Sequence, residues 1–201
     1  MRGKKIGIMG GTFNPIHNGH LILGEMAYEQ FGLDSVLLMP NKKPYYKDIS
    51  GNITEEDRAA MVKIAAEEND HFQFSDIELK RSETTYTVDT LEELTKMYPD
   101  NEYYFILGKD SLDYLEKWKN SSRIMELSKI IAASRDDLDR KIDEKIKELN
   151  QKYHAHIYRL NSPNLEISSS FLRKSLKEGR SCRYLMPDSV LKYIKEKKLY
   201  E

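Results

Sequence analysis

Six short apolar runs separated by longer segments of helical period are the feature that most constrains how this chain can fold. The runs favour β-structure and cover residues 5–9, 36–40, 72–75, 103–107, 130–133 and 156–159. Strands that alternate with helix-length segments are typical of βαβ units, in which a helix connects one parallel strand to the next. We therefore predict an α/β fold with a doubly wound parallel sheet and helices on both of its faces.

The length favours one domain, because chains tend to divide only beyond roughly 250 residues and this chain has 201. The sequence contains no internal repeat, and no linker rich in Pro, Gly or Ser marks a boundary. We expect a single Rossmann-like domain over residues 1–201. A small C-terminal helical part, residues 168–201, is expected to belong to that same domain.

Two of the expected helices carry clear sequence signals. The first begins after Thr54, a favourable N-cap that three acidic residues follow in the first turn. Its apolar face is predicted to contain Ala60, Met61, Ile64 and Ala65. The second spans Asp136 to Gln151, where apolar residues recur at steps of three and four: Leu138, Ile142, Ile146 and Leu149. We interpret the first helix as scaffold and the many charges of the second as a solvated face.

Charge and cysteine content exclude several functional classes. The chain carries 32 basic and 33 acidic residues, so its net charge of -1 provides no basic field for nucleic-acid binding. The longest uncharged stretch, Ile6 to Gly24, contains Pro15 and several polar residues, which a membrane-spanning helix would not combine. The single Cys182 cannot form an internal disulfide, and the N-terminus does not resemble a signal peptide. We therefore expect a cytoplasmic monomer or homo-oligomer without nucleic-acid or membrane partners.

The segment from Ile6 to Leu21 predicts an anion-binding site. A strand runs directly into Gly10 and Gly11, a turn and a helix start, whose unpaired N–H groups can bind phosphate. The segment matches neither the dinucleotide fingerprint G-x-G-x-x-G nor the P-loop, so other donors must replace the P-loop lysine. His17 and His20 are three positions apart and therefore face the same side of the helix start, where both can donate to phosphate oxygens.

Two other interpretations of the histidine pair stay open. A zinc site would need further protein ligands, and no Cys, His, Asp or Glu follows before Glu25. Either histidine could instead be a helix cap or a core residue. The neighbouring glycines, Thr12 and Asn14 favour the anion site, with Gly19 expected to leave room for a ligand.

Three consecutive serines predict a second anion site near the C-terminus. Ser168, Ser169 and Ser170 can cap a helix, and Arg173 can hold phosphate oxygens with its forked guanidinium. A serine run before a helix is often only a cap. Two anion sites at opposite ends of one chain nevertheless support each other.

Both segments resemble motifs of a known superfamily. GGTFNPIHNGH, residues 10–20, is similar to the signature of nucleotidyltransferases that act through a His-x-x-His pair, and ISSSFLRKSL, residues 167–176, resembles their second motif. The resemblance implies that His17, His20 and Arg173 are catalytic. It implies that ATP is bound by Gly10, Gly11, Thr12, Phe13, Lys47, Arg135, Ser168, Ser169 and Ser170. The protein itself is expected to supply no metal ligand, because Mg²⁺ arrives with ATP.

The middle of the chain resembles the bacterial nicotinate mononucleotide adenylyltransferases. The similarity covers nearly the whole length and includes MPNKKPYYK (39–47), TTYTVDTL (84–91), LGKDSLDYLEKW (107–118) and YLMPDSVLKYIKEKKLY (184–200). It implies that Trp118 stacks on the pyridine ring. The other implied contacts to nicotinate mononucleotide come from Thr85, Tyr86, Thr87, Gly108 and Asp110. Considered alone, Trp118 could be a core aromatic, and Thr85 or Thr87 could cap a helix from Val88.

The activity implied by this resemblance is transfer of the adenylyl group of ATP to nicotinate mononucleotide. The products would be nicotinate adenine dinucleotide and pyrophosphate, a step of NAD biosynthesis. A related transferase acting on phosphopantetheine, or a nucleotide sensor without catalysis, is the alternative. The region from Asn41 to Asn52 is a candidate active-site loop. The chain departs from the family pattern at Asn14, which is commonly aspartate, and at KKPYYK (42–47), Glu83, Asp136 and Asp137.

Overall fold

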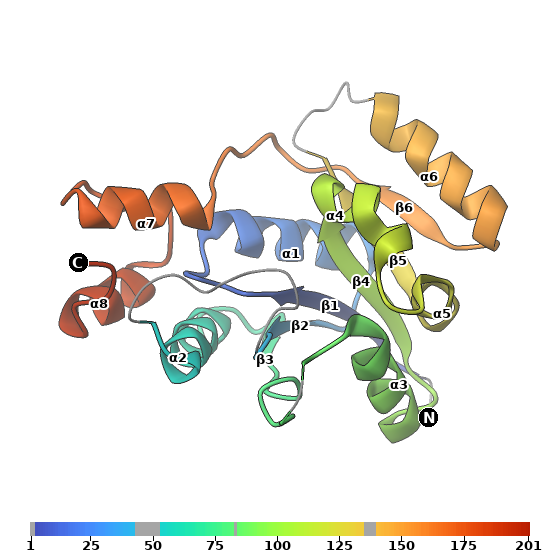
Figure 1. Cartoon of the computed structure of the whole chain (residues 1–201), viewed down its shortest axis with the longest axis horizontal. Coiled ribbons are helices and arrows are strands. Elements are labelled where there is room, and N and C mark those ends of the chain that lie inside the picture. Colours follow the sequence, from blue (N-terminus) through green and yellow to red (C-terminus); the bar gives the residue numbers. More distant parts are fainter. Residues whose placement is uncertain (1–2, 43–52, 83, 135–139) are drawn as a thin grey trace.

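The computed structural model describes residues 3–42, 53–82, 84–134 and 140–201, and its centre is a six-stranded sheet (Figure 1). The strands lie in the order β3-β2-β1-β4-β5-β6, and every neighbouring pair is parallel. The predicted Rossmann-like α/β fold is therefore confirmed. The strand bounds are β1 Lys5–Gly11, β2 Ser35–Pro40, β3 Phe72–Phe74, β4 Glu102–Gly108, β5 Lys129–Ala133 and β6 Ile157–Leu160. All six predicted strands are present, with ends that differ by one or two residues.

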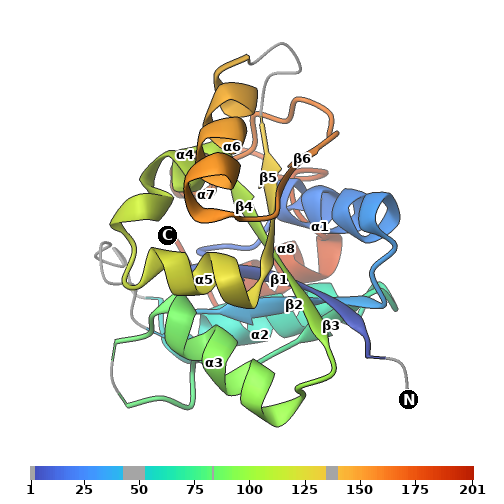
Figure 2. The same ribbon diagram turned by 90° about the vertical axis from the view of Figure 1, so that its right-hand side faces the viewer.

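Helices cover both sides of this sheet, as the view along the molecule shows (Figure 2). Their bounds are α1 Asn18–Phe31, α2 Glu55–Ala66, α3 Thr87–Met97, α4 Lys109–Tyr114, α5 Ser121–Leu127, α6 Arg140–Tyr153, α7 Ser169–Lys177 and α8 Asp188–Glu196. A short 3₁₀ turn, Leu115–Lys117, follows α4.

Alternate residues of the central strands pack against opposite helix layers, because successive side chains of a strand point to opposite faces. On one face, Ile8 and Phe105 join a cluster with residues of α3, α4, α5 and α6. On the other, Met9 and Ile106 join a cluster with residues of α1, α2, α7 and α8. Both faces are therefore buried, which explains why these strands read as nearly continuous apolar runs.

The binding edge of the sheet follows from its topology. β1 pairs with β2 on one side and with β4 on the other, so the strand order reverses between β1 and β4. Open parallel sheets bind ligands at such a reversal, beyond the carboxyl ends of the strands. Those ends are Gly11 for β1 and Gly108 for β4.

The helix predicted after Thr54 is confirmed as α2, but its buried face is rotated relative to the prediction. Met61 and Ala65 are buried as expected, whereas Ala60 and Ile64 are only partly buried. Arg58, at 0% exposure, belongs to the buried face instead. The prediction was wrong here because a search for apolar periodicity leaves out a charged residue. The buried guanidinium of Arg58 is accommodated by the backbone oxygens of Thr12 and Lys42.

The charged helix is also present. In the described residues α6 begins at Arg140 and ends at Tyr153, and it buries Ile142 and Leu149 while most of its charged positions are exposed. The first residues of the predicted helix, 136–139, lie outside the described residues.

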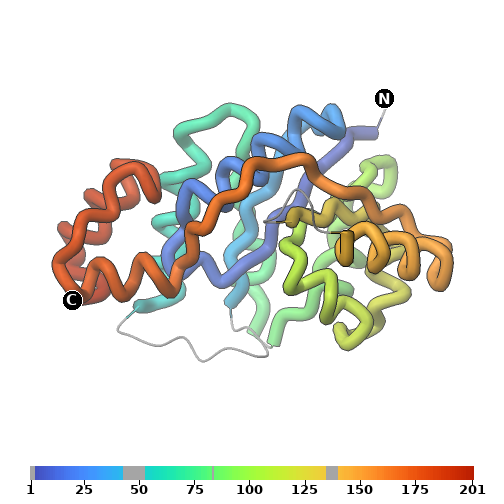
Figure 3. Tube along the Cα trace, turned by 90° about the horizontal axis from the view of Figure 1, so that it is seen from above, coloured from blue at the N-terminus to red at the C-terminus, as the bar shows by residue number. Residues whose placement is uncertain are grey.

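The C-terminal helices return to the N-terminal part of the sheet. An extended segment, residues 161–168, crosses the molecule between β6 and α7 (Figure 3). Leu172 of α7 and Val190 of α8 are buried in the same cluster as α1 and α2. Cys182 lies there too, and burial raises the pKa of its thiol, as suits an ordinary core side chain. Across the described ranges, no helix combines the length and apolar character that crossing a bilayer requires.

Candidate active site

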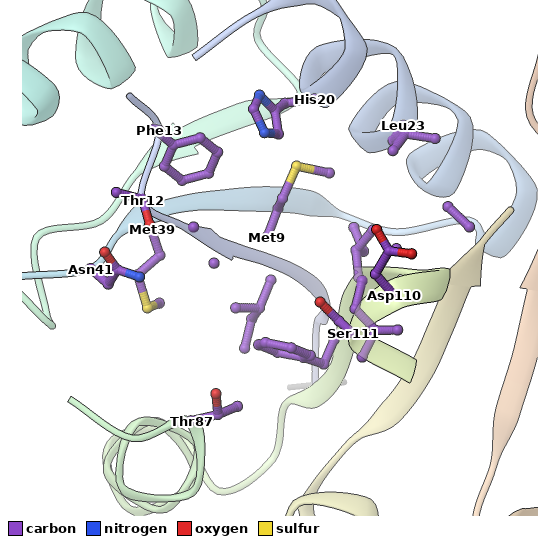
Figure 4. A pocket seen from close by; sticks show the side chains of 18 of the residues that line it. Met9, Thr12, Phe13, His20, Leu23, Met39, Asn41, Thr87, Asp110 and Ser111 are labelled. Carbon is purple, nitrogen blue, oxygen red and sulfur yellow. The ribbon is translucent and has the colours of Figure 1, made fainter. Parts of the chain in front are cut away.

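One cavity of about 1570 Å³ opens at the predicted edge of the sheet (Figure 4). Every predicted site residue that the structure describes lines it, namely Gly10, Gly11, Thr12, Phe13, His17, His20, Thr85, Tyr86, Thr87, Gly108, Asp110, Trp118, Ser168, Ser169, Ser170 and Arg173. Pockets for one small molecule commonly measure about 300–1,000 Å³, so this cavity has room for two nucleotides. The predicted residues Lys47 and Arg135 lie outside the described residues, as do Glu83, Asp136, Asp137 and most of the candidate loop.

The turn between β1 and α1 is held by side chains from distant parts of the chain. Arg58 Nη1 donates to Thr12 O at 2.8 Å, and Arg173 Nη1 donates to Asn14 O at 2.8 Å. Ser169 Oγ donates to Pro15 O at 2.9 Å. Three carbonyl oxygens of the turn are thus engaged by α2 and α7. Because the C=O and N–H of a trans peptide point in opposite directions, holding Thr12 O also fixes the direction of the following N–H group.

The two histidines lie together at the start of α1, as predicted. His17 is the N-cap residue and is 5% exposed, and its ring stacks on that of His20 with centroids 3.7 Å apart. His20 Nδ1 accepts a hydrogen bond from His17 N at 3.3 Å. The neutral His20 ring therefore carries its hydrogen on Nε2, which leaves that atom as the donor. The edge of Phe13 meets His20 at 5.0 Å between centroids, and both side chains lie at the pocket in Figure 4.

Gly19 lines the cavity and also makes room for the His17 ring. A Cβ at this position would meet His17 Nδ1 at 3.0 Å and Ile167 Cβ at 3.5 Å. The space that a Cβ would occupy at Gly19 is therefore filled by the His17 ring. The absence of a side chain at Gly19 allows the imidazole pair to stack.

The second helix start has the predicted cap. Ser168 is the N-cap of α7, and its Oγ accepts from Phe171 N at 3.3 Å. The hydroxyls of Ser168 and Ser170 lie 3.1 Å apart. With Ser169 bound to the β1–α1 turn, the starts of α1 and α7 meet at one cavity.

At the other end of the cavity α3 begins at Thr87, with Tyr86 as its N-cap residue. Tyr86 and not Thr85 or Thr87 is the N-cap residue, so the alternative interpretation of these threonines as helix caps was wrong. Within this segment, Glu78 accepts a hydrogen bond from Thr90 Oγ1 at 2.8 Å, and Thr85 acts to lower the pKa of the same carboxyl. Glu78 is 8% exposed, and burial raises the pKa of its carboxyl. This contact ties the start of α3 to the loop that follows β3.

Trp118 is half-buried at the edge of the cavity. Its ring meets Phe105 edge to face, with centroids 6.0 Å apart and planes at 86°. Asp110 lies in the first turn of α4, after the N-cap Gly108, and is exposed. Lys119 Nζ lies 4.3 Å from the centroid of Tyr86, which adds positive charge near the start of α3.

Two residues that contact the site escaped the sequence prediction. Arg58 bridges Thr12 O and Lys42 O, at 2.8 and 2.9 Å, and no carboxylate of the described residues lies within ion-pair distance of it. Its pKa is lowered by burial. The spacing of Arg58, Met61, Val62 and Ala65 could have revealed its buried position. The second missed residue is Tyr200, whose hydroxyl donates to Asn14 Oδ1. No spacing pattern in the sequence indicates this contact.

A metal centre built from protein side chains is not found in the described ranges, where no three His, Cys, Asp or Glu residues gather in a ligating cluster. The strand reversal, the two capped helix starts and the imidazole pair together define a Rossmann-like nucleotidyltransferase.

Comparison with known proteins agrees with this class. The cytidylyltransferase-like family model matches residues 8–175. The "Probable nicotinate-nucleotide adenylyltransferase" of Lachnoclostridium phytofermentans is 52% identical over 192 residues, which cover 95% of this chain and 96% of the relative. The protein of the same description from Desulfitobacterium hafniense is 41% identical over 199 residues, covering 98% and 96%. The chain belongs to the nicotinate-nucleotide adenylyltransferases of the cytidylyltransferase-like family.

Solved structures share the fold. Plasmodium falciparum nicotinic acid mononucleotide adenylyltransferase complexed with NaAD gives a TM-score of 0.79 at 23% identity, covering 98% of this chain and 97% of that chain. The structure described as its complex with APC gives a TM-score of 0.77 at 22% identity over the same shares of both chains. At these identities the likeness concerns the fold.

Proposed function

We propose that this chain transfers the adenylyl group of ATP to nicotinate mononucleotide, giving nicotinate adenine dinucleotide and pyrophosphate. One observation carries the proposal: the starts of α1 and α7, distant in sequence, meet at a cavity that Trp118 also lines. An anion site at each helix start suits a triphosphate, and an indole edge suits a flat heterocycle. The relative from Lachnoclostridium phytofermentans, 52% identical, supports this acceptor.

The reaction needs no covalent intermediate on the protein. A 5′-phosphate oxygen of nicotinate mononucleotide attacks the α-phosphorus of ATP, and the bond from that phosphorus to the bridging oxygen of pyrophosphate breaks. The attacking phosphate is already anionic, so no proton has to be removed from it. Because both reactants are anions, the task of the protein is to hold them in line and to offset their repulsion.

The helix starts and three side chains perform that task in our proposal. The N–H groups at the starts of α1 and α7 bind phosphate oxygens. His20 donates from Nε2, and His17 orients it through ring stacking and the backbone N–H. Arg173 donates from Nη1 to Asn14 O, and we propose that its remaining N–H groups donate to the triphosphate. Lys47 and Arg135 keep their expected role as further phosphate contacts.

The acceptor occupies the other end of the cavity in this proposal. Trp118 stacks on the pyridine ring, and the start of α3 at Tyr86 and Thr87 receives the nicotinate carboxylate, for which N–H groups of a helix start are suitable donors. Thr85 supports that segment through Glu78. Gly108 and Asp110, where β4 meets α4, hold the ribose.

Mg²⁺ enters with ATP as part of that substrate. It neutralises phosphate charge and leaves with pyrophosphate, so the protein has to supply no dedicated ligand set for it. We further propose that the chain works in the cytoplasm as a single domain, since its one thiol, Cys182, is a buried core side chain and its substrates are small molecules.

The test is an assay of pyrophosphate release with ATP and Mg²⁺ in the presence of one acceptor at a time. Nicotinate mononucleotide should support release, whereas phosphopantetheine should not. The amide form of the mononucleotide should be the weaker acceptor. Release only with phosphopantetheine would contradict the proposed acceptor, and ATP binding without pyrophosphate release would favour the nucleotide sensor.

A further inference from the structure

The hydroxyl of Tyr200, near the C-terminal end of the chain, contacts a residue that lines the cavity. It donates a 2.6 Å hydrogen bond to Oδ1 of Asn14, 186 residues earlier. Asn14 lines the cavity, is 5% exposed, and belongs to the turn that Arg58 and Arg173 hold by its backbone. The hydrogen bond from Tyr200 holds the side chain of Asn14, whereas Arg173 holds its backbone oxygen.

Tyr200 remains a hydrogen-bond donor at neutral pH. Burial raises the pKa of its phenol well above the ordinary value, although the cations Arg173 and Arg58 act in the opposite direction. The phenol hydrogen therefore stays in place and is directed at an amide oxygen, which can only accept.

This bond determines which way the Asn14 amide faces. Oδ1 and Nδ2 point in different directions from the same carbon, so with Oδ1 held at the Tyr200 hydroxyl, Nδ2 lies on the other side of the side chain. In the part of the chain that the structure describes, no acceptor lies within hydrogen-bond distance of Nδ2. The NH₂ group thus has two hydrogens to donate at the cavity edge, where an aspartate at this position would have only oxygens.

We propose that Tyr200 is a positioning residue for ATP, because its hydroxyl fixes the side-chain amide of Asn14 with the NH₂ group directed at the triphosphate. The inference rests on the proposed function for the identity of the ligand. It adds Asn14 Nδ2 to the phosphate donors and makes the C-terminal segment part of the ATP site.

A double-mutant cycle tests the role. The variants are Tyr200→Phe, which removes only the hydroxyl, Asn14→Ala, and both together, and the dissociation constant of MgATP is measured by calorimetry alongside the KM values. Tyr200→Phe should weaken ATP binding by about three- to tenfold, as expected for one lost oriented donor. The KM for nicotinate mononucleotide should change little. In the Asn14→Ala background the same substitution should have almost no further effect on ATP binding.

Tyr193→Phe is the matched control. Tyr193 OH donates to Asp57 Oδ1 at 3.0 Å and links α8 to α2 away from the turn, so its loss should lower Tm without changing ATP affinity. If Tyr200→Phe lowers Tm in the same way but leaves ATP affinity unchanged, the hydroxyl is merely structural and the proposal is overturned. The proposal would also be overturned if the losses of ATP affinity caused by Tyr200→Phe and Asn14→Ala simply added in the double variant. Failure of the unmodified chain to form the dinucleotide would contradict the proposed function alone, because the cycle is measured by ATP binding.

Discussion

The guanidinium of Arg173 donates a 2.8 Å hydrogen bond to the backbone oxygen of Asn14, 159 residues earlier in the chain. Ser169 adds a second link from α7 to the same turn. The two helix starts therefore do not merely face one cavity, since α7 also holds the shape of the turn that precedes α1. Under the proposed function, a change at Arg173 affects both the phosphate contact proposed for it and the position of the neighbouring donors.

His20→Ala should reduce turnover about a hundredfold, because it removes a donor that acts mainly on charge developing in the transition state. The fold should persist, since the side chain is only partly buried. Steady-state kinetics with ATP and nicotinate mononucleotide, together with Tm, measure both effects. The exposed His156 provides the control, and His156→Ala should leave turnover unchanged. Full activity in His20→Ala would refute the assigned role.

Trp118→Ala should raise the KM for nicotinate mononucleotide about tenfold or more, because stacking of a base on an aromatic ring contributes about 1–3 kcal/mol. The KM for ATP should stay close to that of the unmodified chain. Trp118→Phe keeps a flat apolar face and should recover most of the affinity. An equal rise of both KM values would instead indicate that the ring supports the cavity through Phe105.

Arg58→Met should lower the free energy of unfolding by about 2–5 kcal/mol, because Thr12 O and Lys42 O would lose their buried donors. Denaturant unfolding measures the loss, and the KM for ATP should rise as the turn loosens. Arg58→Lys should be intermediate, since one ammonium group cannot reproduce the forked contact. The surface pair of Arg123 with Glu126 gives the comparison, and Arg123→Met should have little effect. If Arg58→Met and Arg123→Met lowered the free energy of unfolding equally, the proposed support of Thr12 O and Lys42 O by Arg58 would be contradicted.

Glu116→Gln should lower stability at neutral pH but not in strong acid. Hydrogen bonds from Lys145, Lys152 and Tyr153 lower the pKa of the Glu116 carboxyl to about 2. A carboxyl whose pKa is lower in the folded state stabilises the fold above its unfolded pKa, and this contribution is lost as the pH falls toward the folded pKa. The difference in Tm between the two proteins should therefore be largest near pH 7 and shrink between about pH 4.5 and 2.

Glu144→Gln is the control for the pH experiment, because Glu144 is an exposed residue of α6, the helix that carries Lys145, Lys152 and Tyr153. Its Tm should follow that of the unmodified chain at every pH. A Glu116→Gln difference that persists unchanged below pH 2 would show that the contacts of Glu116 do not depend on its charge.

Much of the fold follows from local sequence. The six strands are recognisable because a parallel strand buried on both faces needs a short continuous apolar run, and the start of α2 is recognisable because Thr54 and Asp57 supply the cap within four residues. The two anion sites are also local patterns, each a glycine or serine turn before a helix. Their residues could be identified without knowing where the helices lie.

Other features depend on contacts between segments that are separate in the sequence. Arg58 lies on the face of a helix that a periodic pattern assigns to apolar residues, and only the nearby oxygens of Thr12 and Lys42 make its burial possible. A Cβ at Gly19 would meet Ile167, 148 positions later in the chain, as well as the His17 ring.

The sequence by itself determined the strand and helix pattern, the fold class and the glycine and serine turns before α1 and α7, because each depends on the preferences of neighbouring residues. Only the tertiary structure decided that Arg173 holds Asn14 by its backbone and that Tyr200 fixes its side chain. A hydrogen bond between residues more than a hundred positions apart depends on the packing of whole helices against the sheet, and the spacing of residues along the chain does not record it.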